Sequence, residues 1–153
     1  MTYGQTGSGK TFTIRGDTSN FKHRGIIPRS LSKIFETVDE REETKFEISC
    51  SYVEIYNERF FDLLDDLPSD GKPAYAIVEQ KGGLGTYVRG VRRERVESEE
   101  DALNLLFEGE LRRTTAKHLL NKSSNRSHCV FTLYIKQKSS LSNNSATRFS
   151  KLN

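Results

Sequence analysis

The sequence Gly-Gln-Thr-Gly-Ser-Gly-Lys-Thr at positions 4–11 restricts the possible folds more than any other stretch of the chain. It matches the pattern G-x-x-x-x-G-K-[ST], in which glycines let the backbone curl until its N–H groups point at phosphate oxygens. In such a loop Lys10 serves the β- and γ-phosphates of a nucleotide, and the Thr11 hydroxyl serves Mg²⁺. The pattern predicts a nucleotide-binding loop that opens a helix at Lys10, and the alternative is an ordinary glycine-rich turn.

The whole loop is expected to contact the nucleotide, through Gly4, Gln5, Thr6, Gly7, Ser8, Gly9, Lys10 and Thr11. A loop of this kind follows a buried strand. Only Met1, Thr2 and Tyr3 precede it here, whereas a typical strand has ~5 residues. We therefore expect the sequence to begin inside a fold whose earlier strands are absent.

Length and composition indicate one soluble domain. The 153 residues are too few for two ordinary domains, and nine Phe and six Tyr can supply a hydrophobic core. The sequence contains neither a membrane-spanning stretch nor a signal peptide, and its net charge of +3 does not demand a nucleic-acid or membrane partner. Cys50 and Cys129 lie in apolar, strand-like runs, which predicts buried free thiols and an intracellular protein.

The order of helical and extended patterns indicates an α/β fold without internal repeats. One helix is expected from Pro28, because Leu31, Ile34, Phe35 and Val38 form a single apolar stripe. The other expected elements are a helix at 10–14, a flexible polar connection at 15–25, strands at 46–56, 75–78, 86–91 and 128–138, a short helical turn at 57–64, loops at 67–72 and 139–150, and a helix beginning with a capping box at 98–101.

A second polar constellation, Asn-Lys-Ser-Ser-Asn-Arg-Ser-His at 121–128, lies between an expected helix and an expected strand. Its hydroxyls and amides could hold a water or complete Mg²⁺ coordination beside a γ-phosphate, and its Arg could lock the loop through a carboxylate. The alternative is a capped helix end followed by a polar turn. Taken alone, the stretch does not decide between the two.

Four stretches together resemble the kinesin motor domain in order and spacing: YGQTGSGKTFT at 3–13, SYVEIYNERFFDLL at 51–64, YVRGV at 87–91 and NKSSNRSH at 121–128. The shorter stretches HRGIIPRSL, LLFEGE and NRSHCVFTLYI are most similar to the kinesin-nine group of cilia and flagella. The resemblance implies a P-loop NTPase fold of the kinesin-motor type, with a mixed central sheet flanked by helices. Residues 1–153 would be the middle of that motor domain, without the strands before the loop and the strand of the second switch.

The resemblance also implies roles for individual residues. ATP and Mg²⁺ would bind the loop at 4–11, and the stretch at 121–128 would be the first switch. There Ser124 would help to position the attacking water, and Arg126 would pair with a glutamate of the second switch. Asn125 stands where the family has a second Ser that reaches Mg²⁺ and the γ-phosphate. An Asn carbonyl is also a hard ligand but projects farther, so slower or absent hydrolysis is expected.

A basic cluster follows YVRGV, where the family carries a loop that touches tubulin. It consists of Arg89, Arg92, Arg93 and Arg95. Because the surface of tubulin is acidic, the resemblance implies that this cluster contacts microtubules. The alternative is a solvated surface, since several glutamates dilute the charge.

A working kinesin motor also needs a second switch, a main tubulin-binding helix and a stalk, and none of these lies within 1–153. Unpaired sheet edges are then expected to favour aggregation over independent folding, and the isolated chain is expected to have no ATPase. The resemblance implies part of an ATP-driven microtubule motor in the cytoplasm, on the cytoskeleton or a ciliary axoneme, dimeric through a stalk. The alternatives are a non-catalytic, microtubule-binding kinesin relative and an unrelated P-loop nucleotidase or kinase, which the other three motifs argue against.

Overall fold

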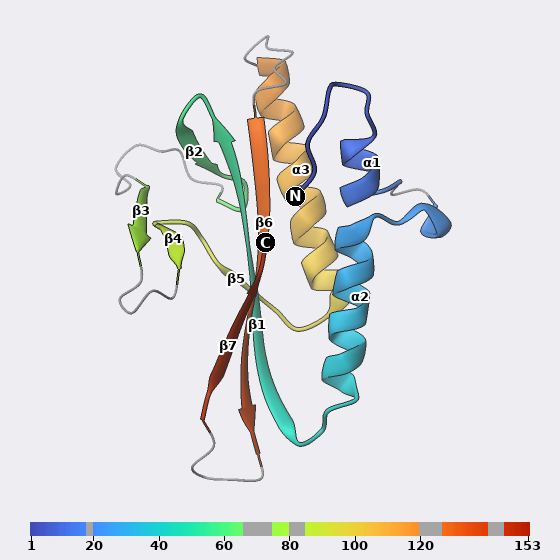
Figure 1. Cartoon of the computed structure of the whole chain (residues 1–153), viewed down its shortest axis with the longest axis vertical. Helices are drawn as coiled ribbons and strands as arrows, with labels where there is room; N and C mark the ends of the chain where they lie inside the picture. Colours follow the sequence, from blue (N-terminus) through green and yellow to red (C-terminus); the bar gives the residue numbers. More distant parts are fainter. Residues whose placement is uncertain (18–19, 66–74, 80–84, 120–126, 141–145) are drawn as a thin grey trace.

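The computed structural model describes residues 1–17, 20–65, 75–79, 85–119, 127–140 and 146–153, with the side chains of 114–119 excepted. Its helices are α1 (Lys10–Ile14), α2 (Ile26–Asp39) and α3 (Glu99–Leu119), with a 3₁₀ turn at Phe21–His23. The strands are β1 (Thr44–Tyr56), β2 (Arg59–Asp62), β3 (Ala76–Glu79), β4 (Thr86–Arg89), β5 (Glu94–Val96), β6 (Ser127–Ser139) and β7 (Arg148–Leu152). The helices lie on one side of the sheet, and the hairpin of β3 and β4 lies on the other (Figure 1).

The sheet is organised around β1, which runs antiparallel to β6 along its whole length. The register runs from Thr44 opposite Ser139 to Tyr56 opposite Ser127. On the other edge of β1, β2 pairs with residues 53–56 at one end and β5 with residues 48–50 near the middle, while β7 extends the sheet beyond β6. The described strand pairs are all antiparallel. β1 and β6 are therefore the two described strands of this sheet with partners on both sides.

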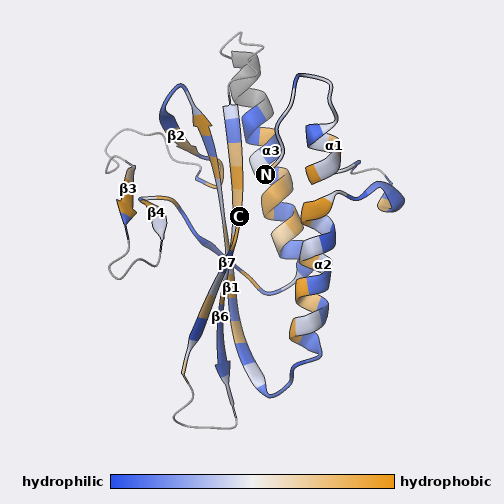
Figure 2. Cartoon of the chain, in the orientation of Figure 1, coloured by the Kyte–Doolittle hydropathy of each residue, from blue (hydrophilic) through white to orange (hydrophobic). Residues whose placement is uncertain are grey.

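The hydrophobic core lies between this sheet and helices α2 and α3. Alternate residues of β1 face the helices, because side chains along a strand point to opposite faces in turn. The buried residues of its two clusters are Leu31, Phe35, Ile48, Cys50, Val96, Ala102 and Leu133, and Tyr52, Leu63, Leu64 and Leu106. Figure 2 shows hydrophobic stretches alternating with hydrophilic ones along α2 and α3, as expected for helices with one buried face.

The two long helices, α2 and α3, were both predicted from the sequence, and the structure confirms them. The stripe of α2 buries Leu31 and Phe35, and the helix begins two residues before Pro28, whose missing N–H costs little in the first turn. At the start of α3 the amide of Asp101 donates to Ser98 Oγ at 3.0 Å, and the amide of Ser98 donates to Asp101 Oδ2 at 3.0 Å. This reciprocal pair is the expected capping box, with Asp in place of Glu.

The expected helical turn at 57–64 is wrong. Residues 59–62 form β2, joined to β1 by a two-residue turn in which Asn57 and Glu58 both have positive φ, 49° and 62°. Such a turn matches the twist of two antiparallel strands, so the segment folds back as a hairpin. The following Leu63 and Leu64 are buried, which explains why their apolar run resembled a helix face.

Two short strands, β5 and β7, were not expected, and their sequences are mostly polar. β5 completes one edge of β1, and β7 occupies residues partly assigned to a loop at 139–150. Pairing with a longer neighbour supplies their hydrogen bonds, which local composition does not reveal. The hairpin of β3 and β4 is confirmed, whereas the loop at 67–72 lies outside the described residues.

The connection between α1 and α2 is more ordered than expected where it is described. Gly16 and Arg24 form an antiparallel bridge, the amide of Asp17 donates to the carbonyl of His23 at 2.9 Å, and that of Gly25 donates to the carbonyl of Arg15 at 3.0 Å. These bonds bring the end of α1 and the start of α2 together. The connection is therefore a closed loop beside the phosphate-binding motif.

Candidate nucleotide-binding site

The loop at 4–11 has the backbone that its glycines predict. Gly7 and Gly9 have φ of 82° and 83°, in the left-handed region that other residues rarely adopt. A Cβ at either position would meet no atom within 4 Å, so conformation, not space, requires glycine there. Gly9 is the N-cap of α1, which turns the chain from the loop into the helix. Figure 1 shows the loop arching from the N-terminus to α1.

The amide groups of this loop are the feature that fits an anion. Within the described residues, the N–H groups of Gly7, Gly9, Lys10 and Thr11 donate to no backbone acceptor. The loop is closed instead by a bond from the amide of Ser8 to the carbonyl of Gln5 at 3.2 Å. Successive N–H groups without internal acceptors, at a glycine-rich turn into a helix, suit phosphate oxygens. The backbone N–H groups of this loop thus fit the phosphates of a nucleoside triphosphate.

Lys10 and Thr11 follow the turn and start α1. The Lys10 ammonium donates to the carbonyls of Gly4 and Gln5, at 2.7 Å each, so it folds back over the loop. Thr11 is exposed, with its hydroxyl able to serve as a hard oxygen ligand. In the described part of the chain no three His, Cys, Asp or Glu side chains gather as a metal site.

The first-switch residues predicted from the sequence, Ser124, Asn125 and Arg126, lie outside the described residues, and their roles remain predictions. The structure does place the end of that motif. Ser127 is the first residue of β6 and accepts a hydrogen bond at its Oγ from Arg113 Nη2 at 3.2 Å. The strand that follows the motif is thus fixed to helix α3.

Arg113 belongs to a partly buried network of charged side chains that the sequence analysis missed. Glu110 accepts a hydrogen bond from the Tyr52 hydroxyl and pairs with Arg15 Nη1 at 3.3 Å and with Arg113 Nη1 at 3.6 Å. Arg113 Nε also donates to Glu54 Oε1 at 3.3 Å. The available signal was the spacing of Glu110 and Arg113 three residues apart on a helix, but many solvated helix faces show such spacing.

Burial and charge set the protonation of this network. Burial is the main cause that raises the pKa of Tyr52, and the nearby carboxylate of Glu110 raises it further. The phenol therefore stays protonated and donates. For Arg113, burial works against the charged form, but the fields of Cys129, Glu110, Tyr52 and Glu54 outweigh it and raise its pKa. At neutral pH the network holds a neutral phenol between charged partners.

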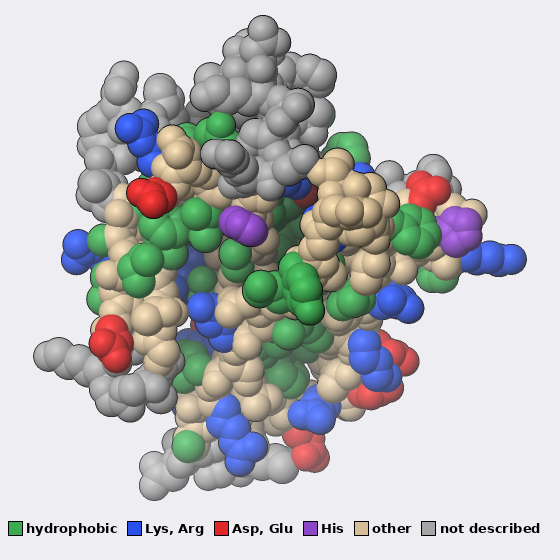
Figure 3. Space-filling view, turned by 45° about the horizontal axis from the view of Figure 1, so that its top comes forward, with side chains coloured by type: hydrophobic (Ala, Val, Ile, Leu, Met, Phe, Trp, Pro, Cys, Tyr) green, Lys and Arg blue, Asp and Glu red, His purple; other side chains and the backbone are tan. Residues whose placement is uncertain are grey.

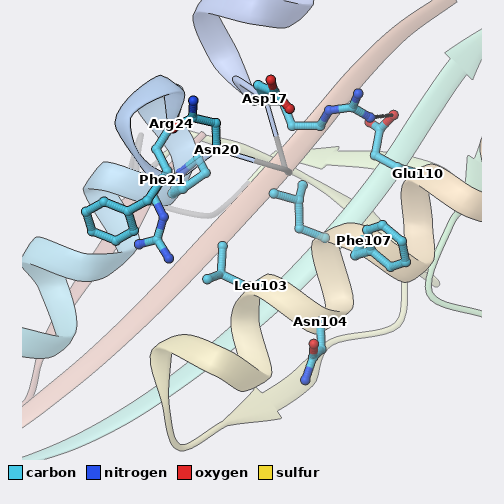
Figure 4. A pocket seen from close by; sticks show the side chains of 11 residues that line it. Asp17, Asn20, Phe21, Arg24, Leu103, Asn104, Phe107 and Glu110 are labelled. Atoms are coloured by element: carbon cyan, nitrogen blue, oxygen red, sulfur yellow. Dashed lines mark hydrogen bonds and ion pairs between the residues drawn. The ribbon is translucent and has the colours of Figure 1, made fainter.

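A pocket of about 550 Å³ lies between the 15–25 connection and α3. Figure 4 shows Asp17, Asn20, Phe21 and Arg24 on one side and Leu103, Asn104, Phe107 and Glu110 on the other. Its two arginines are already paired, Arg15 with Glu110 and Arg24 with Glu99 at 3.0 Å. A triphosphate would have to break these pairs, so the loop at 4–11 fits a triphosphate better than this pocket does.

The basic cluster after β4 is mostly engaged within the molecule. Arg92 pairs with Glu94, Arg95 pairs with Glu97 at 3.4 Å, and the Arg93 guanidinium stacks 4.0 Å from the centre of the Tyr134 ring. On the face in Figure 3, Lys and Arg side chains are spread among acidic and hydrophobic ones rather than gathered in a patch. Contact with microtubules remains a prediction, and Arg89 is an exposed member of the cluster whose side chain makes no ion pair or ring contact within the described residues.

The fold and the loop define an α/β protein of the P-loop nucleotide-binding class. The family model "Kinesin motor domain" matches residues 1–153. The chain therefore belongs to the kinesin motor domain family.

Similar proteins agree with this assignment. The chain is 46% identical over 139 residues to the human kinesin-like protein KIF9. This match covers 91% of this chain and 18% of the length of KIF9. It is 46% identical over 151 residues to the Chlamydomonas reinhardtii kinesin-like protein KLP1, covering 99% of this chain and 19% of the relative. The chain thus spans about a fifth of these relatives, and the resemblance to the kinesin-nine group is confirmed.

A solved structure has the same fold. It is described as the structure of a fast kinesin, with implications for ATPase mechanism and interactions with microtubules, and it matches with a TM-score of 0.84 and 32% identity. The match covers 98% of this chain and 41% of that chain. It confirms the expected kinesin-type fold, a sheet with helices. Separately, no described helix has the length and apolar character to cross a membrane.

Proposed function

We propose that this chain is part of an ATP-dependent microtubule motor and that residues 4–11 bind Mg·ATP. The observation that carries the proposal is the glycine-formed loop with four amide groups free to meet phosphates, in a chain of the kinesin motor domain family. Lys10 would exchange the carbonyls of Gly4 and Gln5 for phosphate oxygens, and Thr11 would supply a ligand to Mg²⁺. The bound Mg²⁺ would neutralise charge that develops on the phosphates during hydrolysis.

Residues of the first switch would supply the hydrolytic step. Ser124 would position the attacking water and Arg126 would pair with a carboxylate outside 1–153, as the family resemblance implies. In the intact protein, hydrolysis would be coupled to microtubule binding and movement. Arg89 and its neighbours would contribute to that contact, with the protein in the cytoplasm on the cytoskeleton or in a cilium, as a dimer through a stalk.

One observation favours a second candidate, a non-catalytic kinesin relative that binds microtubules. Asn125 stands at a position where the family has a hydroxyl near the γ-phosphate. An amide side chain is longer, and its NH₂ group cannot coordinate a cation. Nucleotide binding without turnover is the signature of this alternative, so ATP turnover on microtubules separates the two.

The test of the loop compares Lys10→Ala with Lys33→Ala in the full-length protein. Lys33 is an exposed lysine of α2 that pairs with Glu36, so its loss removes one positive charge outside the loop. Fluorescence titration with a labelled ATP and Mg²⁺ should give a Kd at least ~10-fold weaker for Lys10→Ala, since bonds to charged groups contribute ~1.5–3 kcal/mol. Equal affinities in the two variants would refute the assignment of the loop.

The microtubule contact has its own test. Replacing Arg89 with Ala should weaken co-sedimentation with microtubules more at low salt than at high salt, because ionic screening shortens the range of surface charges. Lys33→Ala serves as the matched control, because it removes one exposed positive charge from α2, outside this cluster. Unchanged binding in the Arg89 variant at low salt would count against this surface.

A further inference from the structure

Helix α3 connects two parts of the candidate site that are far apart in the sequence. At one end of the connection Arg15, the C-cap of α1, pairs with Glu110 at 3.3 Å. At the other, Arg113 donates to Ser127, the first residue of β6, at 3.2 Å. Glu110 and Arg113 also pair with each other at 3.6 Å. The phosphate-loop helix and the residue after the 121–126 stretch are therefore joined through two side chains one turn apart.

Burial makes this connection specific. The side chains of Glu54, Glu110 and Arg113 are only 10%, 16% and 21% exposed, so water competes weakly for their hydrogen bonds. Two arginines, Arg15 and Arg113, face two carboxylates, and the cluster is balanced in charge. If Arg15 moved away, Glu110 would keep Arg113 and Tyr52 as partners but lose one of its two positive neighbours. If Ser127 moved away, Arg113 would lose one of its hydrogen-bond acceptors. A displacement at either end thus disfavours the present arrangement of the other.

The strand β1 gives this cluster a fixed base. Tyr52 and Glu54 lie on the helix-facing side of β1, where Tyr52 donates to Glu110 and Glu54 accepts from Arg113. The Tyr52 ring is itself packed edge-on against Phe131 with ring centres 5.5 Å apart. β1 has strand partners on both edges, and Ser127 of β6 is itself paired with Tyr56 of β1, so both strands support the cluster.

We infer that Glu110 and Arg113 are positioning residues that couple nucleotide binding at the loop to the placement of the start of β6. Neither touches the nucleotide: Glu110 acts through Arg15 on α1, and Arg113 acts through Ser127 on the end of the 121–128 motif. This inference rests on the proposed function, since it assigns a route by which the loop and the motif would respond to one another.

The experiment measures hydrogen exchange of a peptide covering residues 127–133 in the full-length protein, with and without Mg·ADP. The variants are Glu110→Gln, which keeps the shape but removes the charge, and Arg113→Lys, which keeps the charge but loses the planar fork. Glu108→Gln is the matched control, because Glu108 is an exposed carboxylate on the same helix that pairs with Arg112, outside the network. Each variant is also titrated with labelled ADP and followed through thermal unfolding.

Wild type and Glu108→Gln are expected to show slower exchange of this peptide when Mg·ADP is bound. Glu110→Gln and Arg113→Lys are expected to bind Mg·ADP with a Kd within about threefold of wild type but to lose most of that protection from exchange. Residues of one hydrogen-bond and ion-pair network are energetically coupled, so changing either one should weaken the response of the peptide. A purely structural role would lower the unfolding temperature without abolishing the nucleotide-dependent difference.

The possible failures are distinguishable. If wild type does not bind Mg·ADP, the proposed function fails, and this inference fails with it. If wild type binds and protects the peptide but both variants protect it equally well, only the coupling through α3 is refuted. Should Glu110→Gln fail to fold, the result for Arg113→Lys alone decides between the two outcomes.

Discussion

Replacing Gly109 with Ala tests how tightly α3 is packed on β1. Gly109 is buried, and a Cβ there would lie 2.9 Å from Cε1 of the Tyr52 ring, closer still to Cδ1, and 3.4 Å from the Leu63 Cβ. Only the Leu63 distance is an ordinary contact. The ring cannot move freely, because it packs against Phe131 and its hydroxyl donates to Glu110. Glycine is therefore required by close approach of helix and strand.

The expected magnitude is the balance of three contributions. Ala is better than Gly in a helix by ~1 kcal/mol. Forcing an extra carbon into a packed core costs ~1–3 kcal/mol. Moving the ring also weakens its bond to the Glu110 carboxylate, and bonds to charged groups contribute ~1.5–3 kcal/mol. We expect Gly109→Ala to lower the free energy of unfolding by ~2–4 kcal/mol, near the upper end for single substitutions.

The assay is urea unfolding followed by far-ultraviolet circular dichroism, for Gly109→Ala alone and combined with Tyr52→Val. Val lacks the two ring carbons that the new methyl group would meet, so in that background Gly109→Ala should be neutral or stabilising by up to ~1 kcal/mol. The reasoning fails if Gly109→Ala is as stable as wild type when Tyr52 is present. It also fails if the cost is the same with Val at position 52, because the ring would then not be its cause.

Three further predictions concern capping, thiols and the first switch. Ser98→Ala should destabilise the protein by ~1 kcal/mol in the same unfolding assay. Hydrogen bonds from the Glu97 amide and Ser98 lower the pKa of Asp101, so the stabilisation that its carboxylate contributes is present above the ordinary Asp pKa of 3.8 and is lost as pH falls through the lower folded-state pKa. An acid titration in which Asp101→Asn unfolds at the same pH as wild type would contradict this pH dependence. Iodoacetamide at pH 8 should label Cys129 before Cys50, since burial raises the pKa of the Cys50 thiol to about 12; mass spectrometry showing Cys50 labelled first would be the contrary result. Asn125→Ser in the full-length protein should raise microtubule-stimulated ATP turnover, and equal or lower turnover would remove Asn125 as the limiting residue.

Local patterns sufficed for the elements whose signals are local. The phosphate loop, the apolar stripe of α2 and the alternating run of β1 follow from glycine spacing and from periods of about 3.6 and 2 residues. The capping box at Ser98 and Asp101 is likewise a short-range device. The conformation of each of these segments is confirmed, because the interactions that specify it lie within a few residues of one another, whereas phosphate binding by the loop stays a prediction.

The missed elements depend on distant partners. The stretch 59–62 has aromatic residues that suit a helix face or a strand, and its place beside β1 decides for the strand. β7 is a strand because β6 offers it an edge, although its residues are all exposed. A propensity scale contains no information on that edge, so composition favoured a loop.

The sequence by itself determined the conformation of the glycine-rich loop at 4–11 and the family, because both follow from the positions of glycines and motifs along the chain. Only the tertiary structure decided that three of the four arginines near β4 already have intramolecular partners, and that Arg15, Glu110 and Arg113 form one network between α1 and β6. The physical reason is that electrostatic partners are chosen by distance and burial, and residues 15, 110 and 127 become neighbours only when α3 packs against the sheet.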